Sequence, residues 1–579
     1  MKKYNVTKYG LCGDGKFNNS EPLSALLENL PDDSMLFFPE GTYLFSQVVK
    51  FENKKKLSIV GENATLMTHF ESCGDPANNN NLFSFENCED ICLSDFIITT
   101  DDIIGWSGVV TNVNVDELYY DVRIYDQFHV TGFEHPIALN TCDKDGSPDY
   151  MFDDPVWQPT GNVTVNGVEG LRYGAHAYEV IGDHLCRFKA RSAETLSKLC
   201  VGEQVCYRFI TYGNCHLGFK ATKRVLIKNV DMYRAPSMCI VIGGRSEDFT
   251  LDHFTVKPAP GSRELYSANC DGIHIYSLGG YFKMRHCEFV GLGDDSLNVH
   301  SMPASVIKKL DGDKFEIMQP VFDYDNFGAV KYNPLVNEWG QKGDILEIYD
   351  TETFEQKGTI MVQSLDDGVL TYSKLEGSFE EGNILINNSV CPSVHISDCT
   401  VKNTRARAFL IRTRNVLIEN CYMYGLSLPA ILITPDIVRW YEVGNSRDIT
   451  VRNNVIEKCA FIKSPANRGA IAVKSCDDDW NNLDYASYVH KNIRILDNKF
   501  INVGNSAVFI SATDGVEISG NNFENCSSRR FSPTAYGIRH DVVTYNCNDV
   551  TVKDNVSTQK ESRVFWAKKC KNVKVLKGE

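Results

Sequence analysis

The stretch Val225-Leu-Ile227-Lys-Asn229 is the first of nine copies of one pattern in this chain. In each copy two apolar residues stand two positions apart, and a residue that favours a bend, usually Asn or Asp, follows two positions later. Alternation with period 2 predicts a strand that buries one of its faces. The other copies begin at Phe249, Phe282, Val394, Val416, Ile449, Ile493, Val516 and Val550.

The spacing of these copies indicates a solenoid. Successive copies begin 24, 33, 112, 22, 33, 44, 23 and 34 residues apart. A basic period of 22 to 24 residues, with some turns lengthened by loops, predicts an all-β parallel β-helix in which each coil buries its apolar side against its neighbours. Asn or Asp suits the bend after a strand, because it tolerates left-handed dihedral angles. A leucine-rich repeat is the alternative, but its Leu-x-x-Leu-x-Leu frame is missing.

Two segments interrupt the repeat, residues 105–220 and 301–390. Both contain strand patterns separated by turn residues, so we expect two small antiparallel β-barrels inserted between coils. The second insert begins directly after His300, which makes it a candidate wall for a binding pocket. A short amphipathic helix over 22–27 is expected to cap the open end of the solenoid. The solenoid itself then comprises an N-terminal part with the cap, a central part with three aspartates and a C-terminal part, residues 1–104, 221–300 and 391–579.

The composition narrows the possible partners and locations. The 579 residues include 59 basic and 75 acidic side chains, and a net charge of −16 disfavours nucleic acid and anionic lipid as partners. No apolar run of about 18 residues occurs, so no membrane span is expected. The segment after Met1 lacks the apolar stretch of a signal peptide, which predicts a cytoplasmic protein.

The 20 cysteines are spread through a long chain. Without a sign of export, most are expected to be reduced thiols. No Cys-x-x-Cys pair occurs, so the cysteines do not suggest a zinc site. Several follow the repeated strand pattern and are expected to be small buried residues, namely Cys287, Cys399 and Cys421.

Three carboxylates accompany two neighbouring predicted strands. Asp271 precedes the first strand, and Asp294 and Asp295 precede the second. An offset of 24 residues places Asp271 opposite Asp295. Stacked strands lie about 4.8 Å apart. Two carboxylates at that distance repel by about 3 to 4 kcal/mol at an effective dielectric near 20, so we expect Asp271 and Asp295 to titrate as a coupled pair.

Further polar side chains share the face of these strands. The same offset places His274 opposite Asn298 and Tyr276 opposite His300. Two alternatives to a catalytic site remain open. The aspartates can be corner residues of the solenoid, like the Asn and Asp that end other strands, or they can form a calcium site, against which the histidines argue.

Carboxylates without a Ser-His pair are the tools of glycoside hydrolysis, in which one acid protonates the leaving oxygen and a carboxylate activates water or attacks carbon. Arginine and tryptophan side chains favour sugar hydroxyls and sugar faces. A surface ion-pair cluster with a buried tryptophan is the alternative for such residues here. The candidates for substrate binding are His274, Asn298, His300, Arg405, Arg407, Arg412, Asp436, Trp440 and Glu442.

Four motifs together carry a resemblance to a known family: Asp271-Gly-Ile-His274, Gly293-Asp294-Asp295-Ser-Leu-Asn298-Val-His300, Arg405-Ala-Arg407 and Trp440-Tyr-Glu442. In these motifs, and from about Tyr9 to Asn522, the chain resembles glycoside hydrolase family 110, the exo-acting α-1,3-galactosidases. The resemblance implies a right-handed β-helix with two inserted barrels, and inverting hydrolysis of terminal galactose from an oligosaccharide without a metal or other cofactor. It also implies that Asp294 is the general acid, while Asp271 and Asp295 position and deprotonate the water.

Other readings stay open beside this resemblance. The paired aspartates are also similar to those of family 28 polygalacturonases, which hydrolyse pectin, but the Gly-His-Gly element of that family is absent. A non-catalytic glycan-binding β-helix is the third reading. The chain has His300-Ser301 where family 110 usually has His-Gly, and a cytoplasmic enzyme suggests short imported oligosaccharides rather than polymers. A homodimer is compatible with the sequence.

Overall fold

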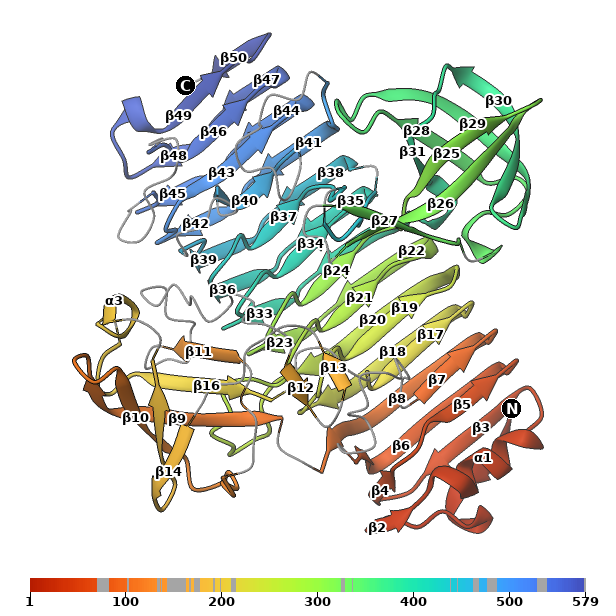
Figure 1. Ribbon diagram of the computed structural model, residues 1–579, viewed down its shortest axis with the longest axis vertical. Coiled ribbons are helices and arrows are strands. Elements are labelled where there is room, and N and C mark those ends of the chain that lie inside the picture. Colours follow the sequence, from red (N-terminus) through yellow and green to blue (C-terminus); the bar gives the residue numbers. More distant parts are fainter. Residues whose placement is uncertain are drawn as a thin grey trace.

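The computed structural model describes residues 1–69, 83–101, 104–132, 136, 138–142, 163–165, 168–170, 178–190, 193–197, 199–209, 215–323, 329–335, 337–437, 439–444, 446–461, 468–475, 487–527 and 539–576. A column of parallel strands forms the body of the molecule, with the N-terminus at one end and the C-terminus at the other (Figure 1). Helix α1 (Ser20–Glu28) lies at the N-terminal end and buries Leu23, Leu26 and Leu27, as expected of a cap.

The nine sequence repeats stack in register. Val225 pairs with Phe249, Phe249 with Phe282, and Phe282 with Val394, so the register continues across the second insert. The remaining copies continue the same parallel ladder to Val550. The strands concerned are β18 (Lys223–Met232), β20 (Ser246–Val256), β22 (Leu278–Arg285), β32 (Ser393–Ser397), β35 (Arg414–Glu419), β38 (Arg447–Arg452), β41 (His490–Leu496), β44 (Thr513–Ser519) and β47 (Asn548–Lys553).

The bend residue of every copy has a positive φ. Asn229 lies at 51°, Asn420 at 55° and Gly520 at 69°, and the other six copies behave alike. Asn, Asp and Gly adopt this left-handed conformation more readily than other residues do. The alternating apolar residues point into the column, where Val225 is 2% exposed and Ile227 fully buried. Burial of each such side chain contributes roughly 1.5–3 kcal/mol, which is what holds consecutive coils together.

A second parallel sheet of twelve strands forms another face of the column. It carries the two strands on which the aspartates were predicted, β21 and β24, as adjacent members. Its strands in order are β5 (Val49–Glu52), β7 (Phe83–Glu86), β17 (Leu217–Lys220), β19 (Ile240–Gly243), β21 (Ile273–Ile275), β24 (Leu297–Val299), β34 (Phe409–Ile411), β37 (Ile431–Ile433), β40 (Gly469–Val473), β43 (Ser506–Ser511), β46 (Val542–Tyr545) and β49 (Phe565–Lys568).

A buried asparagine ladder crosses the C-terminal coils. The amide of Asn454 donates to Asn498 Oδ1 at 2.9 Å, Asn498 donates to Asn521 at 3.1 Å, and Asn521 donates to Asn555 at 2.9 Å. The same amides also donate to strand carbonyls of the preceding coil, those of Ile418, Val451 and Ile495. Because an unsatisfied buried amide is costly, the ladder fixes the turn of each coil against the next.

Both interruptions of the repeat are antiparallel. The first contains the row β11 (Ala138–Cys142), β16 (Gln204–Arg208), β9 (Gly105–Asn114), β10 (Tyr119–Ile124), β15 (Leu185–Lys189) and β14 (Tyr178–Gly182). Where a barrel was predicted, the described residues thus show a six-stranded sheet packed around a core of its own. The second insert contains β25 (Ala304–Leu310), β31 (Ile384–Asn387), β28 (Ile345–Tyr349), β29 (Gln356–Asp366), β30 (Val369–Gly377), β26 (Lys314–Phe322) and β27 (Val330–Asn333).

The second insert is a closed barrel, as predicted, because β26, the sixth strand of the row, pairs back with β25, and β27 extends the sheet from β26. In Figure 1 the two inserts lie on opposite sides of the solenoid, with the coils of β21 and β24 between them. None of the helices that the structure describes is long and apolar enough to cross a membrane. The buried cysteines of the strand pattern are free thiols, as expected: Cys287, Cys399 and Cys421.

Candidate active site

Asp271 and Asp295 occupy equivalent corners of consecutive coils, as the 24-residue offset predicted. They precede β21 and β24, in which His274 pairs with Asn298. The backbone amide of Asp295 donates to Asp271 Oδ1 at 3.1 Å. Close approach of the two corners requires glycine, because a Cβ on Gly272 would lie 2.7 Å from the carbonyl oxygen of Ser296.

Asp294 completes a cluster of three carboxylates. One oxygen each of Asp271, Asp294 and Asp295 lie within 4.8 Å of one another. The side chain of Asp294 is 23% exposed, against 8% for Asp271 and 3% for Asp295. Asp294 is therefore the carboxylate of the three that is most open to a ligand.

Burial and mutual repulsion perturb two of these carboxylates. Burial raises the pKa of Asp295 to about 7, since the repulsion by Asp294 and Asp271 adds to it and Arg407 offsets only part of the effect. Burial also raises the pKa of Asp271, although the hydrogen bond from His274 opposes this. The cluster thus holds a proton to near neutral pH, a condition that acid and base catalysis both use.

The predicted arginines Arg405 and Arg407 contact the carboxylate cluster. Arg407 donates from its backbone amide to Asp295 Oδ1 at 3.0 Å, and from its guanidinium to both carboxylate oxygens. Arg405 lies 3.5 Å from Asp294 and donates to the carbonyl oxygen of Gly293 at 2.5 Å. The charge-assisted bonds from Arg407 fix the orientation of Asp295, and Arg405 forms a looser ion pair with Asp294.

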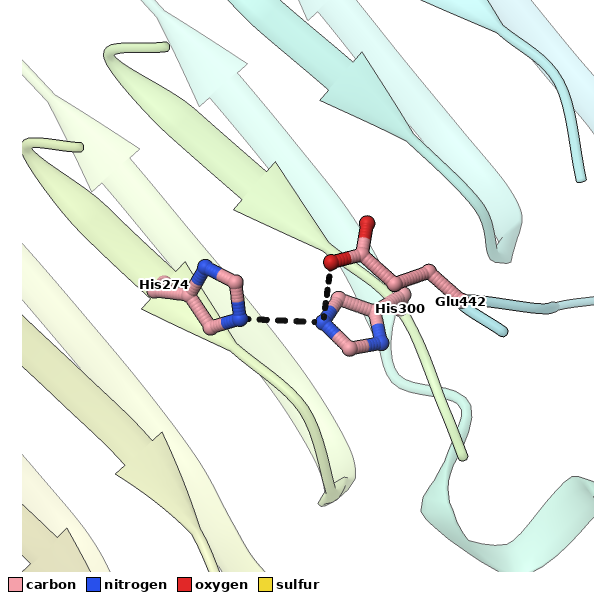
Figure 2. Close-up of side chains that lie close together, drawn as sticks. All are labelled: His274, His300 and Glu442. Carbon is pink, nitrogen blue, oxygen red and sulfur yellow. Dashed lines mark hydrogen bonds and ion pairs between the residues drawn. The ribbon is translucent and has the colours of Figure 1, made fainter. Parts of the chain in front are cut away.

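A second cluster lies beside the first and contains His274, His300 and Glu442 (Figure 2). The Nε2 atoms of the two rings face each other at 3.1 Å, and Glu442 Oε1 lies 3.6 Å from His300 Nε2. Asp271 links the clusters, because its Oδ2 lies 2.8 Å from His274 Nδ1. The predicted substrate-binding histidines therefore lie directly next to the predicted catalytic carboxylates.

The titration of this second cluster follows from its charges. Burial lowers the pKa of His274, but Asp271 and Glu442 outweigh burial and the pKa lies above its ordinary value. Burial lowers the pKa of His300 to about 4. Burial raises the pKa of Glu442, but the charges of His300 and Arg412 lower it more, and the resulting pKa is about 2. Glu442 is therefore ionised at neutral pH.

Arg412 and Asn298 fix Glu442. Arg412 is 1% exposed and donates to Glu442 Oε2 at 2.6 Å and to Asn298 Oδ1 at 3.2 Å. Asn298 in turn donates to Glu442 Oε2 at 3.2 Å. Arg412 was predicted to bind substrate directly, but its depth and partners place it behind Glu442, which it orients.

Asp436 and Trp440 have different roles in the loop that carries Glu442. Asp436 is fully buried, and its two carboxylate oxygens accept the backbone amides of Arg439 and Trp440 at 2.8 and 3.1 Å. We therefore assign Asp436 to shaping this loop rather than to contacting substrate. Trp440 is 41% exposed, so its ring is available to a ligand, unlike the buried tryptophan that was the alternative.

Arg208 of the first insert is a contributor that sequence reasoning missed. It is 1% exposed and donates to the carbonyl oxygens of Asn269 at 2.6 Å and Gly293 at 3.4 Å. These carbonyls lie just before the corners that carry Asp271 and Asp294. Its only sequence signal was its place within the predicted first insert, which did not indicate where the side chain would point.

The second insert packs against the same region from the other side. Ser301 pairs with Val443 as an isolated bridge, next to Glu442. Val443 shares a hydrophobic cluster with Tyr349 and Ile384 of the insert. The insert thus supports the Glu442 loop, in keeping with its predicted place beside the pocket.

Comparison with known proteins gives two family models. Residues 3–237 match a model described as rhamnogalacturonase A/epimerase, pectate lyase-like, and residues 382–577 match one described as right handed beta helix region. A solved structure, a hyperthermoactive exopolygalacturonase from Thermotoga maritima, aligns over 100% of this chain and 92% of its own with 13% identity and a TM-score of 0.42. The fold is a right-handed parallel β-helix.

Two relatives extend the comparison. Alpha-1,3-galactosidase A of Bacteroides thetaiotaomicron is 27% identical over 346 residues, 58% of this chain. The chain spans 56% of the length of that relative, and 48% of its counterpart from Bacteroides fragilis. Alpha-1,3-galactosidase B of Bacteroides thetaiotaomicron is 22% identical over 582 residues, 96% of this chain and 91% of its own. The chain is thus similar, over nearly its whole length, to a protein named an α-1,3-galactosidase.

Proposed function

We propose that this protein is an exo-acting glycoside hydrolase that removes terminal α-1,3-linked galactose from oligosaccharides. The observation that carries the proposal is the convergence of Asp271, Asp294 and Asp295, with oxygens within 4.8 Å of one another, in a site that Arg407 and His274 orient. The names of the relatives support the choice of sugar and linkage. The reaction needs only carboxylates that differ in protonation.

The roles follow from exposure and contacts. Asp294 is the most exposed carboxylate, and we assign it to protonate the leaving oxygen. Asp271 and Asp295 lie deeper, joined by the amide of Asp295, and they are assigned to orient a water and remove its proton. His274 and Glu442, with side chains 16% and 14% exposed, are assigned to the sugar hydroxyls, with the more deeply buried His300 and Asn298 beside them. Trp440 is 41% exposed and is assigned to a sugar face.

We also propose that hydrolysis inverts the anomeric configuration. Asp271 and Asp295 lie on one side of the site and each already accepts a hydrogen bond from a neighbour, which suits a pair that binds water better than a nucleophile. The oxygen separations within 4.8 Å are shorter than the about 6.5–9.5 Å usual for inverting enzymes and close to the about 5 Å of retaining ones. The stereochemistry of the product therefore decides between the two mechanisms.

The test is to incubate the protein with α-1,3-galactobiose and follow the anomeric protons by NMR in the first minutes. Initial release of β-galactose is the expected result, and initial α-galactose would reassign one carboxylate as a nucleophile. Polygalacturonic acid and p-nitrophenyl α-galactoside are tested in parallel. Hydrolysis of polygalacturonic acid alone would favour the pectin hydrolase, and binding of galactosides without any product would favour a glycan-binding protein.

A cytoplasmic location and a homodimer belong to the same proposal and stay predictions. Thiol titration of freshly purified, denatured and unreduced protein should approach the 20 cysteines of the sequence if the protein folds in a reducing compartment. Sedimentation equilibrium measures whether the mass corresponds to one or two chains of 65.1 kDa.

A further inference from the structure

In the cluster of His274, His300 and Glu442, two ring nitrogens and one carboxylate oxygen lie close together (Figure 2). His300 Nδ1 lies 3.2 Å from the carbonyl oxygen of Ser301, which can only accept, so this nitrogen carries the ring proton. His274 Nδ1 likewise faces the carboxylate oxygen of Asp271 at 2.8 Å. In both neutral rings the lone pair is then on Nε2, and the two Nε2 atoms face each other at 3.1 Å.

The carboxylate of Glu442 adds a third acceptor to this meeting point. Both of its described donors, Arg412 and Asn298, bond to Oε2. Oε1 instead lies 3.6 Å from His300 Nε2. Three acceptor atoms from three parts of the chain thus converge, and with both rings neutral no hydrogen lies between them. Such an arrangement is stable only when a cation or an added proton lies among the three atoms.

Two of the three separations in the cluster are compatible with a transition metal ion. A four-coordinate Zn²⁺ with bonds of about 2.0–2.1 Å holds its donor atoms roughly 3.3 Å apart. The separations of His300 Nε2 from His274 Nε2, 3.1 Å, and from Glu442 Oε1, 3.6 Å, bracket this value. His274 and Glu442 lie within 4.8 Å of each other, so a small rotation of the Glu442 carboxylate would bring its oxygen to the same ion. A set of two imidazoles and one carboxylate also favours Zn²⁺ over Ca²⁺ or Mg²⁺, which prefer oxygen ligands alone.

Each of the three residues has an outer partner that orients it. Asp271 accepts from His274, the carbonyl of Ser301 accepts from His300, and Arg412 donates to Glu442. Metal-binding histidines typically donate their other ring N–H to a carboxylate or a backbone carbonyl in this way. The exposed histidines His253 and His286 also lie close together, with ring centroids 4.8 Å apart. Neither belongs to the two groups of potential metal-binding side chains among the described residues, so this pair provides a comparison.

We infer that His274, His300 and Glu442 form a binding site for one Zn²⁺-class divalent metal ion, which completes its coordination with water. The three-aspartate cluster is less suited to such an ion, because Arg407 already bonds both oxygens of Asp295. A metal on His274 Nε2 places positive charge one imidazole away from Asp271. The ion is therefore expected to inhibit hydrolysis rather than to assist it, a consequence that rests on the proposed function.

Metal binding is measured directly, without reference to activity. Tag-free protein is treated with a chelator, dialysed and titrated with ZnCl₂ in a calorimeter, and with CoCl₂ while the visible absorption of bound Co²⁺ is recorded. One ion per chain with the strong absorption of a low-symmetry, four- or five-coordinate Co²⁺ site is expected. His274→Gln, His300→Gln and Glu442→Gln should each weaken binding by about 100-fold or more, whereas the control His286→Gln should leave it unchanged. Circular dichroism verifies that each variant is folded.

The outcomes separate this inference from the proposed function. If neither Zn²⁺ nor Co²⁺ binds the folded wild-type protein, or if His286→Gln weakens binding as much as His300→Gln, the inference is wrong and a shared proton occupies the position. If the metal binds but no galactoside is hydrolysed, the site stands and the proposed function falls. With both correct, ZnCl₂ inhibits hydrolysis of p-nitrophenyl α-galactoside, and the chelator restores it.

Discussion

The backbone amide of Asp295 donates a hydrogen bond to the carboxylate of Asp271, a residue 24 positions earlier in the chain. The bond spans one coil of the solenoid and runs parallel to the backbone ladder between β21 and β24. One aspartate is therefore oriented by the main chain of the other. The relative position of the two carboxylates therefore depends on the register between β21 and β24.

Replacing Asp294 by Asn tests the general acid. The variant should fold normally, and its kcat on α-1,3-galactobiose should fall by about 100-fold or more, since general acid catalysis contributes about that much. Aryl galactosides should lose less, because their leaving group needs little protonation. Asp398→Asn, which changes an exposed aspartate at a bend of another coil, is the matched control. Retention of more than about a tenth of wild-type kcat on the disaccharide would exclude this role for Asp294.

The raised pKa of Asp295 predicts that this residue makes the fold less stable as pH rises. Its pKa is about 7 in the folded protein, against an ordinary value of 3.8. The folded state thus binds this proton more tightly than the unfolded state does. The contribution of Asp295 to the free energy of unfolding is therefore full below about pH 4, and it is lost as pH rises through 7, by at most about 1.4 kcal/mol per pH unit.

Melting temperatures of the wild type and Asp295→Asn at pH 5, 6, 7 and 8 measure this effect. The difference, variant minus wild type, should become more positive with each step. Asp121→Asn is the control, because Arg187 lowers the pKa of Asp121 and this carboxylate is already ionised at pH 5. The difference in melting temperature for this variant should therefore stay constant from pH 5 to 8. A difference for Asp295→Asn that stays constant from pH 5 to 8 would contradict the raised pKa.

Arg208 is predicted to act as a positioning residue across domains. Arg208→Gln removes the bonds to the carbonyls of Asn269 and Gly293, and misplacement of the catalytic corners should lower kcat by about 10- to 100-fold with a smaller change in KM. Arg208→Lys should restore part of kcat. Arg187→Gln breaks an ion pair elsewhere in the same insert and serves as the control. Equal losses of kcat in Arg208→Gln and Arg187→Gln would indicate general damage to the insert.

The asparagine ladder is predicted to stabilise the C-terminal coils without a catalytic role. Asn498→Ala leaves the carbonyl of Val451 and the amide of Asn454 without their partner, at a cost of about 1–3 kcal/mol for each buried group. The melting temperature should fall by several degrees, with kcat at 25 °C unchanged. Asn525→Gly removes a similar but exposed bond to Asn502, retains the ability to adopt the positive φ of 52° at this position, and should change the melting temperature less. Equal effects of the two variants would argue against burial as the cause.

The repeat and the aspartate pair could be predicted because both depend on local pattern and on a fixed period. Once Val225 and Phe249 are aligned, the same offset places Asp271 beside Asp295. The bends were predictable for the same reason, since a left-handed residue at the end of each strand is a property of that residue type.

The rest of the site depends on contacts that no period encodes. Arg208 reaches carbonyls 61 and 85 residues away because the first insert packs on the solenoid in one particular way. Glu442 meets Asn298 across 144 residues through a loop whose shape Asp436 determines. Sequence pattern identified these side chains as polar and close to a coil, but which of them face a ligand and which orient a neighbour follows only from their depth and partners.

The direct pairing of Phe282 with Val394 means that the second barrel is a side branch of the solenoid rather than a link in it. Its residues can change in number without altering the vertical distance between the coils that carry the aspartates. The spacing of the carboxylates and the composition of the barrel are therefore separable properties of this architecture. In proteins of the same design the barrel can vary in size while Asp271, Asp294 and Asp295 keep their positions on consecutive coils.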